Sequence, residues 1–350
     1  MPGVFMANSY SLSQLGWKHF FQQQLSLEEW EVNTIARVVG VERSVIDLLT
    51  TEGKQSLAVT PRMPAFAVGD WLLLDEQDRF HRLLDRNTLF SRKAAGTKIS
   101  TQLIAANVDT VFIVSSLNQD FNLNRFERYL ALANETGVTP VIVLTRLDLC
   151  ENPEEYLSKV HSLDPSLDVV VINSLAQESV EQLKVWCTTG ETVALLGSSG
   201  VGKSTIINTL LGSNIQSTQA LREDDDKGRH TTTQRSIHFL PAGGLMLDTP
   251  GMRELQIASC EHGIDETFSE IVELATGCKF TDCQHDKEPG CAVRQAIEAG
   301  ILDQRRLISY QKLMKEQTFN TLSLAEKRAK DREFGRYVRS VMDSKQNKKE

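Results

Sequence analysis

The chain has 350 residues, of which 41% are hydrophobic and 24% charged, with a formal net charge of -8. This length exceeds one ordinary hydrophobic core, so we expect two or three domains of globular composition. No apolar run is long enough to cross a membrane, and residues 1–10 lack the basic and apolar segments of a signal peptide, so we expect a cytoplasmic protein with no membrane partner.

The N-terminal third reads as a short lead-in followed by a β-rich domain. Residues 1–30 are amphipathic, with Leu15, Trp17, Phe20 and Phe21 as apolar positions. From residue 31 to 100 the pattern is strand-like and broken by glycines, which predicts a small five-stranded β-barrel. The pattern alone does not separate an OB barrel from an SH3-like one. The expected strands are 34–39, 44–48, 55–59, 70–74 and 79–84.

Residues 105–258 have the pattern of an α/β domain. Continuous apolar runs alternate with helical spacing, and residues 122–136 are the clearest helix, with Gly137 as its stop. Strands buried on both faces indicate a mainly parallel sheet. The expected strands are 110–114, 140–144, 169–172, 192–196 and 245–247.

A phosphate-binding loop follows the strand at 192–196. It fits the pattern Gly-x-x-x-x-Gly-Lys-Ser and precedes a helix, which is the context that a P-loop requires. We expect Lys203 to reach the β- and γ-phosphates and the Ser204 hydroxyl to bind Mg²⁺. The loop consists of Gly197, Ser198, Ser199, Gly200, Val201, Gly202, Lys203, Ser204 and Thr205.

A second carboxylate for Mg²⁺ is expected on a neighbouring strand. Asp248 ends the strand at 245–247 and begins the run Asp-Thr-Pro-Gly, in which the N–H of Gly251 can sense the γ-phosphate. Between the P-loop and Asp248 lies the run Gly-Arg-His-Thr-Thr-Thr at 228–233, where we expect a switch loop. Any of its three threonines could bind Mg²⁺, and Thr232 is our candidate.

The base-reading motif lies upstream of the P-loop. Directly after the expected strand at 140–144 come Thr145, Arg146, Leu147 and Asp148. The carboxylate of Asp148 can accept hydrogen bonds from N1–H and the 2-amino group of guanine, two donors that adenine lacks. The side chain of Arg146 can cover the base. Asn173 and Ser174 end the next strand and form the expected second base loop. Base motif, P-loop and Asp248 thus occur in the order of a circularly permuted GTPase.

The remainder, residues 259–350, reads as helical around a metal cluster. Cys278, Cys283, His285 and Cys291 offer three thiolates and one imidazole, a closed set for one structural Zn²⁺. Residues 305–350 contain 13 Lys or Arg and 6 Asp or Glu, so a basic tail follows an acidic body. This asymmetry is compatible with RNA contact at that end, or with a solvated helical surface.

These motifs, in this order, resemble the bacterial circularly permuted GTPases of the RsgA (YjeQ/YloQ) family over residues 30–340. The resemblance implies an N-terminal OB fold, a permuted GTPase domain and a zinc domain. It also implies a monomer that binds GTP, GDP and Mg²⁺, acts late in maturation of the small ribosomal subunit, binds its rRNA, and is stimulated by the subunit. The chain departs from the family where Arg146 replaces the usual lysine.

Hydrolysis needs a group that orients water. Met252 stands where many GTPases have a glutamine, and a thioether cannot orient water, so we expect slow intrinsic turnover. His230 is the nearest candidate, by position and by the resemblance, although a structural hydrogen bond would explain it equally well. An alternative function is a nucleotide-gated RNA-binding module in which turnover is incidental.

Overall fold

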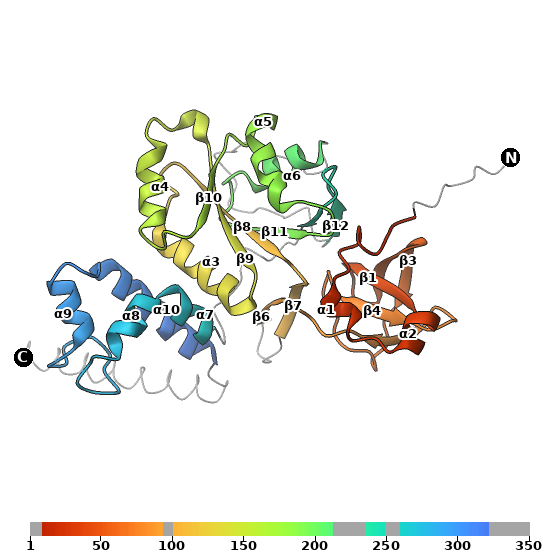
Figure 1. The fold of residues 1–350 in the computed structure, drawn as a ribbon, viewed down its shortest axis with the longest axis horizontal. Helices are drawn as coiled ribbons and strands as arrows, with labels where there is room; N and C mark the ends of the chain where they lie inside the picture. The colour runs from red at the N-terminus through yellow and green to blue at the C-terminus, as the bar shows by residue number, and fades with distance from the viewer. Residues whose placement is uncertain (1–8, 94–100, 213–235, 249–259, 322–350) are drawn as a thin grey trace, which may run out of the picture. The chain divides into compact units, whose positions relative to one another are not determined.

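In a computed structural model of the chain, the described residues are 9–93, 101–212, 236–248 and 260–321. They divide into two compact units (Figure 1). The first contains residues 1–91 and 103–255, and the second contains residues 92–102 and 256–350. Within the described ranges, every helix is too short or too polar to span a membrane.

The first unit begins with a five-stranded antiparallel sheet, which confirms the predicted β-rich domain. Its strand order is β3-β2-β1-β4-β5, with a bulge between Val38 and Gly40 where β1 changes register against β2. One face buries a cluster that includes Val38, Ile46 and Leu72. The strands are β1 (Thr34–Val41), β2 (Val45–Thr50), β3 (Gly53–Ala58), β4 (Trp71–Leu74) and β5 (Phe80–Leu83).

The lead-in covers the other face of this sheet. It contains the short helices α1 (His19–Gln22) and α2 (Leu27–Val32), the latter started by a capping box at Ser26 and Glu29. Leu15 and Phe21 are buried against Trp71 on β4. The lead-in therefore belongs to the hydrophobic core of the first unit.

A six-stranded sheet forms the rest of the first unit, in the order β10-β9-β8-β11-β13-β12 (Figure 1). Five strands are parallel, as predicted, and β12 is an antiparallel edge strand that the sequence pattern did not predict. The strands are β8 (Thr110–Ser116), β9 (Thr139–Thr145), β10 (Asp168–Val171), β11 (Thr192–Leu196), β12 (Ser236–Phe239) and β13 (Leu245–Asp248).

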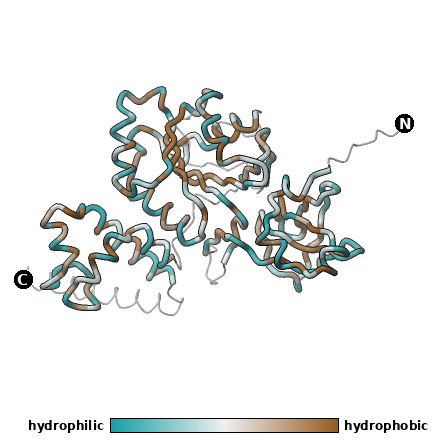
Figure 2. The backbone as a smooth tube through the Cα atoms, in the orientation of Figure 1, coloured by the Kyte–Doolittle hydropathy of each residue, from teal (hydrophilic) through white to brown (hydrophobic). Residues whose placement is uncertain are grey.

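Helices cover both faces of the six-stranded sheet. Apolar side chains of α6 pack with those of η2 on one face, while α3 lies against β8 and β9 (Figure 1). Hydrophobic residues concentrate along the central strands (Figure 2). The helices are α3 (Leu123–Thr136), η1 (Leu147–Leu149), α4 (Pro153–His161), α5 (Gln177–Val180), η2 (Glu181–Trp186) and α6 (Lys203–Leu211).

A buried arginine connects the two sheets of the first unit. The guanidinium of Arg37 on β1 donates to the carbonyl of Leu15 and to Oγ1 of Thr192 at 2.8 Å, where β11 begins. Burial lowers the pKa of Arg37 to about 10, although the charges of Asp109 and Asp70 oppose that shift. The two sheets are therefore joined by a hydrogen bond between two buried polar side chains, those of Arg37 and Thr192.

The second unit is helical around the cysteine run, as predicted. Its helices are α7 (Glu261–Thr267), α8 (Ser269–Ala275), α9 (Ala292–Glu298) and α10 (Gln304–Thr321). Arg306 on α10 donates to Glu270 at 2.7 Å and lies 4.5 Å from the ring centre of Phe268.

Strands β6 (Leu89–Lys93) and β7 (Thr101–Ala106) form a separate two-stranded sheet.

Candidate nucleotide site and metal cluster

The carboxyl ends of four strands bring the predicted nucleotide-binding segments to one edge of the six-stranded sheet. Thr145 ends β9, Asn173 follows β10, Gly197 follows β11 and Asp248 ends β13. Since β8, β9, β10, β11 and β13 run parallel, these ends share an edge. In open α/β sheets this edge is where ligands bind.

The P-loop begins in close contact with β8. Gly197 has a φ of +147°, and a β-carbon there would lie 2.3 Å from the carbonyl oxygen of Val114, so only glycine fits. The ammonium of Lys203 donates to the carbonyl of Gly197 at 2.7 Å and to that of Ser198. The cation thus lies across its own loop, where an anion could take the place of these two carbonyls.

Thr145 ties the predicted base motif to the P-loop. Its side chain is fully buried, and its hydroxyl donates to the carbonyl of Val201 at 2.7 Å. The next residue, Arg146, adopts a left-handed conformation with φ of 65° and donates to the carbonyl of Gly200 at 2.9 Å. The guanidinium thus contacts the P-loop, and its predicted place over a base stays a prediction.

Asp148 stands exposed within η1, two residues beyond Arg146. The backbone of η1 is tied to the neighbouring strand end, because the N–H of Leu147 donates to the carbonyl of Ile172 at 3.2 Å. The backbone at Asp148 therefore lies on a short, anchored turn at the edge of the sheet, and its exposed carboxylate has solvent access that a ligand base could use.

The predicted second base loop, at Asn173 and Ser174, packs against helix α6. The carbonyl of Ser174 accepts a hydrogen bond from the Thr209 hydroxyl at 3.1 Å, and the Ser174 residue is 9% exposed. The side-chain carbonyl of Asn173 accepts from the N–H of Leu175 at 3.0 Å. These contacts shape the loop and hold it beside the P-loop helix.

Asp248 is paired across the ladder with Ser236, the first residue of β12. The Ser236 hydroxyl in turn lies 2.9 Å from Nε2 of His238. Ser204 and Thr205 are half-buried in the first turn of α6. The predicted residues His230, Thr232 and Gly251 lie outside the described residues.

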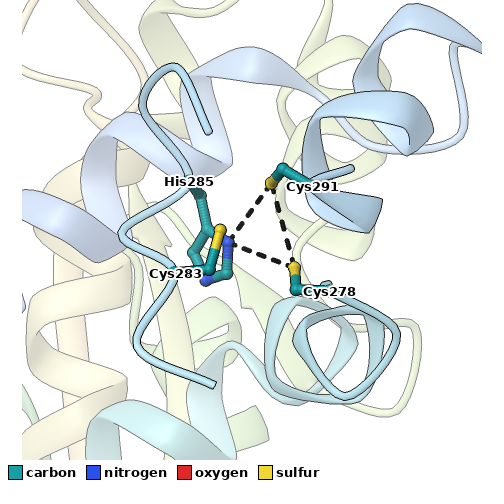
Figure 3. A group of neighbouring side chains, drawn as sticks. All are labelled: Cys278, Cys283, His285 and Cys291. Carbon is teal, nitrogen blue, oxygen red and sulfur yellow. Dashed lines mark hydrogen bonds between the residues drawn. The ribbon is translucent and has the colours of Figure 1, made fainter. Parts of the chain in front are cut away.

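In the second unit the four predicted ligands converge (Figure 3). Their ligand atoms all lie within 4.8 Å of one another. Cys278 Sγ is 3.9 Å from Cys291 Sγ, and the two sulfurs are 3.6 and 3.4 Å from Nδ1 of His285. A tetrahedral Zn²⁺ bound at standard lengths separates sulfurs by about 3.8 Å and sulfur from nitrogen by about 3.5 Å. The cluster therefore fits a zinc ion.

The protonation of the cluster also suits a metal. Desolvation opposes ionisation of Cys278, but the N–H groups of Val293 and Ala292 together with the Cys291 and Cys283 thiols outweigh it and lower the pKa of Cys278. Desolvation raises the pKa of Cys283 to about 11, with a contribution from the neighbouring thiols, and lowers the pKa of His285. The imidazole is therefore ready as a neutral ligand, and binding would release a proton from Cys283.

Comparisons with known proteins agree with these features. The family model described as RsgA GTPase matches residues 83–258. "Small ribosomal subunit biogenesis GTPase RsgA 2" of Vibrio parahaemolyticus is 55% identical over 347 residues, which cover 99% of this chain and 97% of that protein. "Small ribosomal subunit biogenesis GTPase RsgA" of Mesorhizobium japonicum is 49% identical, over 90% of this chain and 92% of its own length.

Solved structures show the same fold. YjeQ from Thermotoga maritima has a TM-score of 0.59 at 23% identity and covers 81% of this chain and 98% of its own. YloQ, titled a circularly permuted GTPase, also has a TM-score of 0.59 at 23% identity, over 83% of this chain and 97% of its own. The predicted fold class, a circularly permuted GTPase, is therefore confirmed.

Proposed function

Because this chain belongs to the RsgA GTPase family, we propose that it hydrolyses GTP to GDP and phosphate during maturation of the small ribosomal subunit. Relatives named as small ribosomal subunit biogenesis GTPases match it along 90% or more of its length. The observation that carries the proposal is the convergence of P-loop, base motif and Asp248 on one sheet edge. The names of these relatives favour the enzyme over a nucleotide-gated RNA-binding module in which turnover is incidental.

The phosphates bind at the start of α6. Backbone N–H groups from Gly197 to Thr205 face the anion, and Lys203 exchanges its two loop carbonyls for β- and γ-phosphate oxygens. Ser204 and Asp248 hold Mg²⁺, which neutralises the developing charge on the phosphates.

Asp148 selects guanine. Its exposed carboxylate accepts from N1–H and the 2-amino group, which adenine cannot offer in that arrangement. Thr145, Arg146 and Leu147 set the position of Asp148 relative to the P-loop, and Asn173 with Ser174 completes the base pocket.

Hydrolysis uses residues that follow α6 in the chain. Thr232 contributes to the Mg²⁺ site, the N–H of Gly251 senses the γ-phosphate, and His230 orients the attacking water. With Met252 in place of a glutamine, intrinsic turnover is slow and the small subunit stimulates it.

Cys278, Cys283, His285 and Cys291 hold one structural Zn²⁺. All four positions of the tetrahedron are filled by protein atoms, so the ion stabilises the fold of the second unit and leaves no position for a substrate.

The organisation follows from these sites. Residues 1–30 are a lead-in, 31–100 an OB-like barrel, 105–258 the GTPase domain, and 259–350 the helical zinc domain with a basic tail that contacts ribosomal RNA of the small subunit. The protein acts as a monomer at ribosomes in the cytoplasm.

The test is GTP turnover measured with and without purified small subunits, with ATP as the control nucleotide and Lys203→Ala as the inactive control protein. We expect subunits to raise turnover of GTP and to leave ATP unhydrolysed. Turnover that subunits do not change would favour the RNA-binding module instead.

A further inference from the structure

Strand β12 connects the predicted switch segment to the strand that carries Asp248. The chain enters β12 from residues 213–235 and pairs with β13, so that Ser236 lies opposite Asp248 and Phe239 opposite Leu245. Among the described residues β12 is an edge strand, so the ladder bonds found there hold it on the β13 side alone. Its position depends on what packs against its other surfaces.

The closed end of this hairpin is packed against residues 187–191, which lead into β11. Added β-carbons would lie 2.4 Å from Thr189 Oγ1 at Gly243 and 2.5 Å from the carbonyl of Cys187 at Gly244. The N–H of Leu245 donates to the carbonyl of Glu191 at 2.8 Å. The turn is therefore closely packed, whereas at the open end Asp248 pairs with Ser236 and lies one residue beyond Leu247, the last residue of β13 that pairs with β11.

The lead-in supplies an aromatic contact to β12, which also lies against β1. The ring of Tyr10 stacks on Phe239 with centroids 4.7 Å apart and planes 4° from parallel. The N–H of Tyr10 donates to the carbonyl of Thr51 at 3.1 Å, which ties Tyr10 to the turn between β2 and β3. Both rings pack on the cluster that contains Leu15 and Trp71. One hydrophobic cluster thus joins lead-in, barrel and β12.

We propose that Tyr10 is a positioning residue for GTP hydrolysis, which holds β12 so that Asp248 meets the Mg²⁺ of the bound nucleotide. The inference rests on the proposed function of this site. Three residue steps, about 10 Å of strand, separate Phe239 from Ser236, and the ladder to β13 transmits a tilt of β12 to Asp248. A misplacement of about 1 Å at a reacting site can cost up to about 100-fold in rate.

The experiment uses the full chain, without subunits, and follows single-turnover GTP hydrolysis across a Mg²⁺ titration. We expect Tyr10→Ala to lower the rate at saturating GTP about tenfold and to raise the Mg²⁺ concentration for half-maximal rate by a similar factor. GTP affinity measured at saturating Mg²⁺ should stay within about twofold, because Tyr10 touches neither P-loop nor base motif.

Three variants control for loss of packing alone. Tyr10→Phe keeps the stacked ring and should restore the wild-type rate, whereas Tyr10→Leu keeps apolar bulk without the stack and should stay impaired. Phe20→Ala removes a ring from the same cluster whose aromatic contact is with Phe21, so it should lower stability and leave the Mg²⁺ dependence unchanged.

Different results would contradict the positioning role of Tyr10 and the GTPase function. If Tyr10→Ala and Tyr10→Leu hydrolyse GTP with the rate and Mg²⁺ dependence of the wild type, the positioning role of Tyr10 is wrong and the GTPase assignment stands. If the wild type itself turns over no GTP, with or without small subunits, the proposed function is wrong and the inference about Tyr10 falls with it.

Discussion

The nucleotide edge of the six-stranded sheet and the cysteine cluster of the second unit are organised by different forces. At the nucleotide edge, β11 is buried along its whole length and its loop is held by hydrogen bonds between protein groups, such as Thr145 to Val201. In the cluster, Cys278, Cys283 and His285 are half-buried on irregular chain between short helices. The first site is arranged by the fold, whereas we expect the second to arrange the fold once an ion is bound.

Removing the metal should give the largest effect and should fall on one unit alone. Structural zinc contributes about 10–16 kcal/mol in small metal-dependent domains. We therefore expect a strong chelator, or Cys283→Ser, to unfold helices α7 to α10, seen as lost hydrogen-exchange protection in residues 260–321. GTP binding by the first unit should persist. Cys150→Ser, outside the cluster, is the matched control and should leave protection intact.

Retained protection in residues 260–321 after complete removal of zinc would contradict this contrast. It would mean that the apolar contacts around Phe268 and Leu307 suffice for the second unit. The ion would then have a role other than folding.

The base motif offers a smaller and more selective change. In Asp148→Asn the carboxylate that we propose accepts two guanine hydrogen bonds becomes an amide with one acceptor and one donor group. Losing charged hydrogen bonds worth about 1.5–3 kcal/mol should weaken GTP binding about 10- to 100-fold. Xanthosine triphosphate, with a carbonyl in place of the 2-amino group, should bind the variant better than GTP does, as measured by titration.

That exchange of preference is the critical result, because general damage to the site would weaken both nucleotides alike. Zinc content and the protection of residues 260–321 should be those of the wild type. If Asp148→Asn binds GTP as the wild type does, the base is read elsewhere.

The sequence predicted most of these features where the determining residues are near one another. Strands β8, β9 and β11 were predicted because burial on both faces makes them continuously apolar, and the cluster because its ligands fall within fourteen residues. Strand β12 was missed since its four residues are half-buried and include Ser236 and His238. The sequence pattern divides the lead-in from the barrel, because local periodicity does not reveal that residues such as Leu15 pack on Trp71, which is far away in the chain.

The same limit applies to Thr145, whose partner Val201 lies 56 residues away. We expect Thr145→Val to remove this buried hydrogen bond and leave the Val201 carbonyl unsatisfied, at a cost of about 1 kcal/mol. Affinity for GTP should fall about fivefold by titration, with guanine still preferred to xanthine because Asp148 is intact. Thr145→Ser retains the hydroxyl and should recover most of the affinity. A Thr145→Val protein with full affinity would show that the P-loop keeps its shape without the base motif, so that the nucleotide edge is arranged by its strands alone.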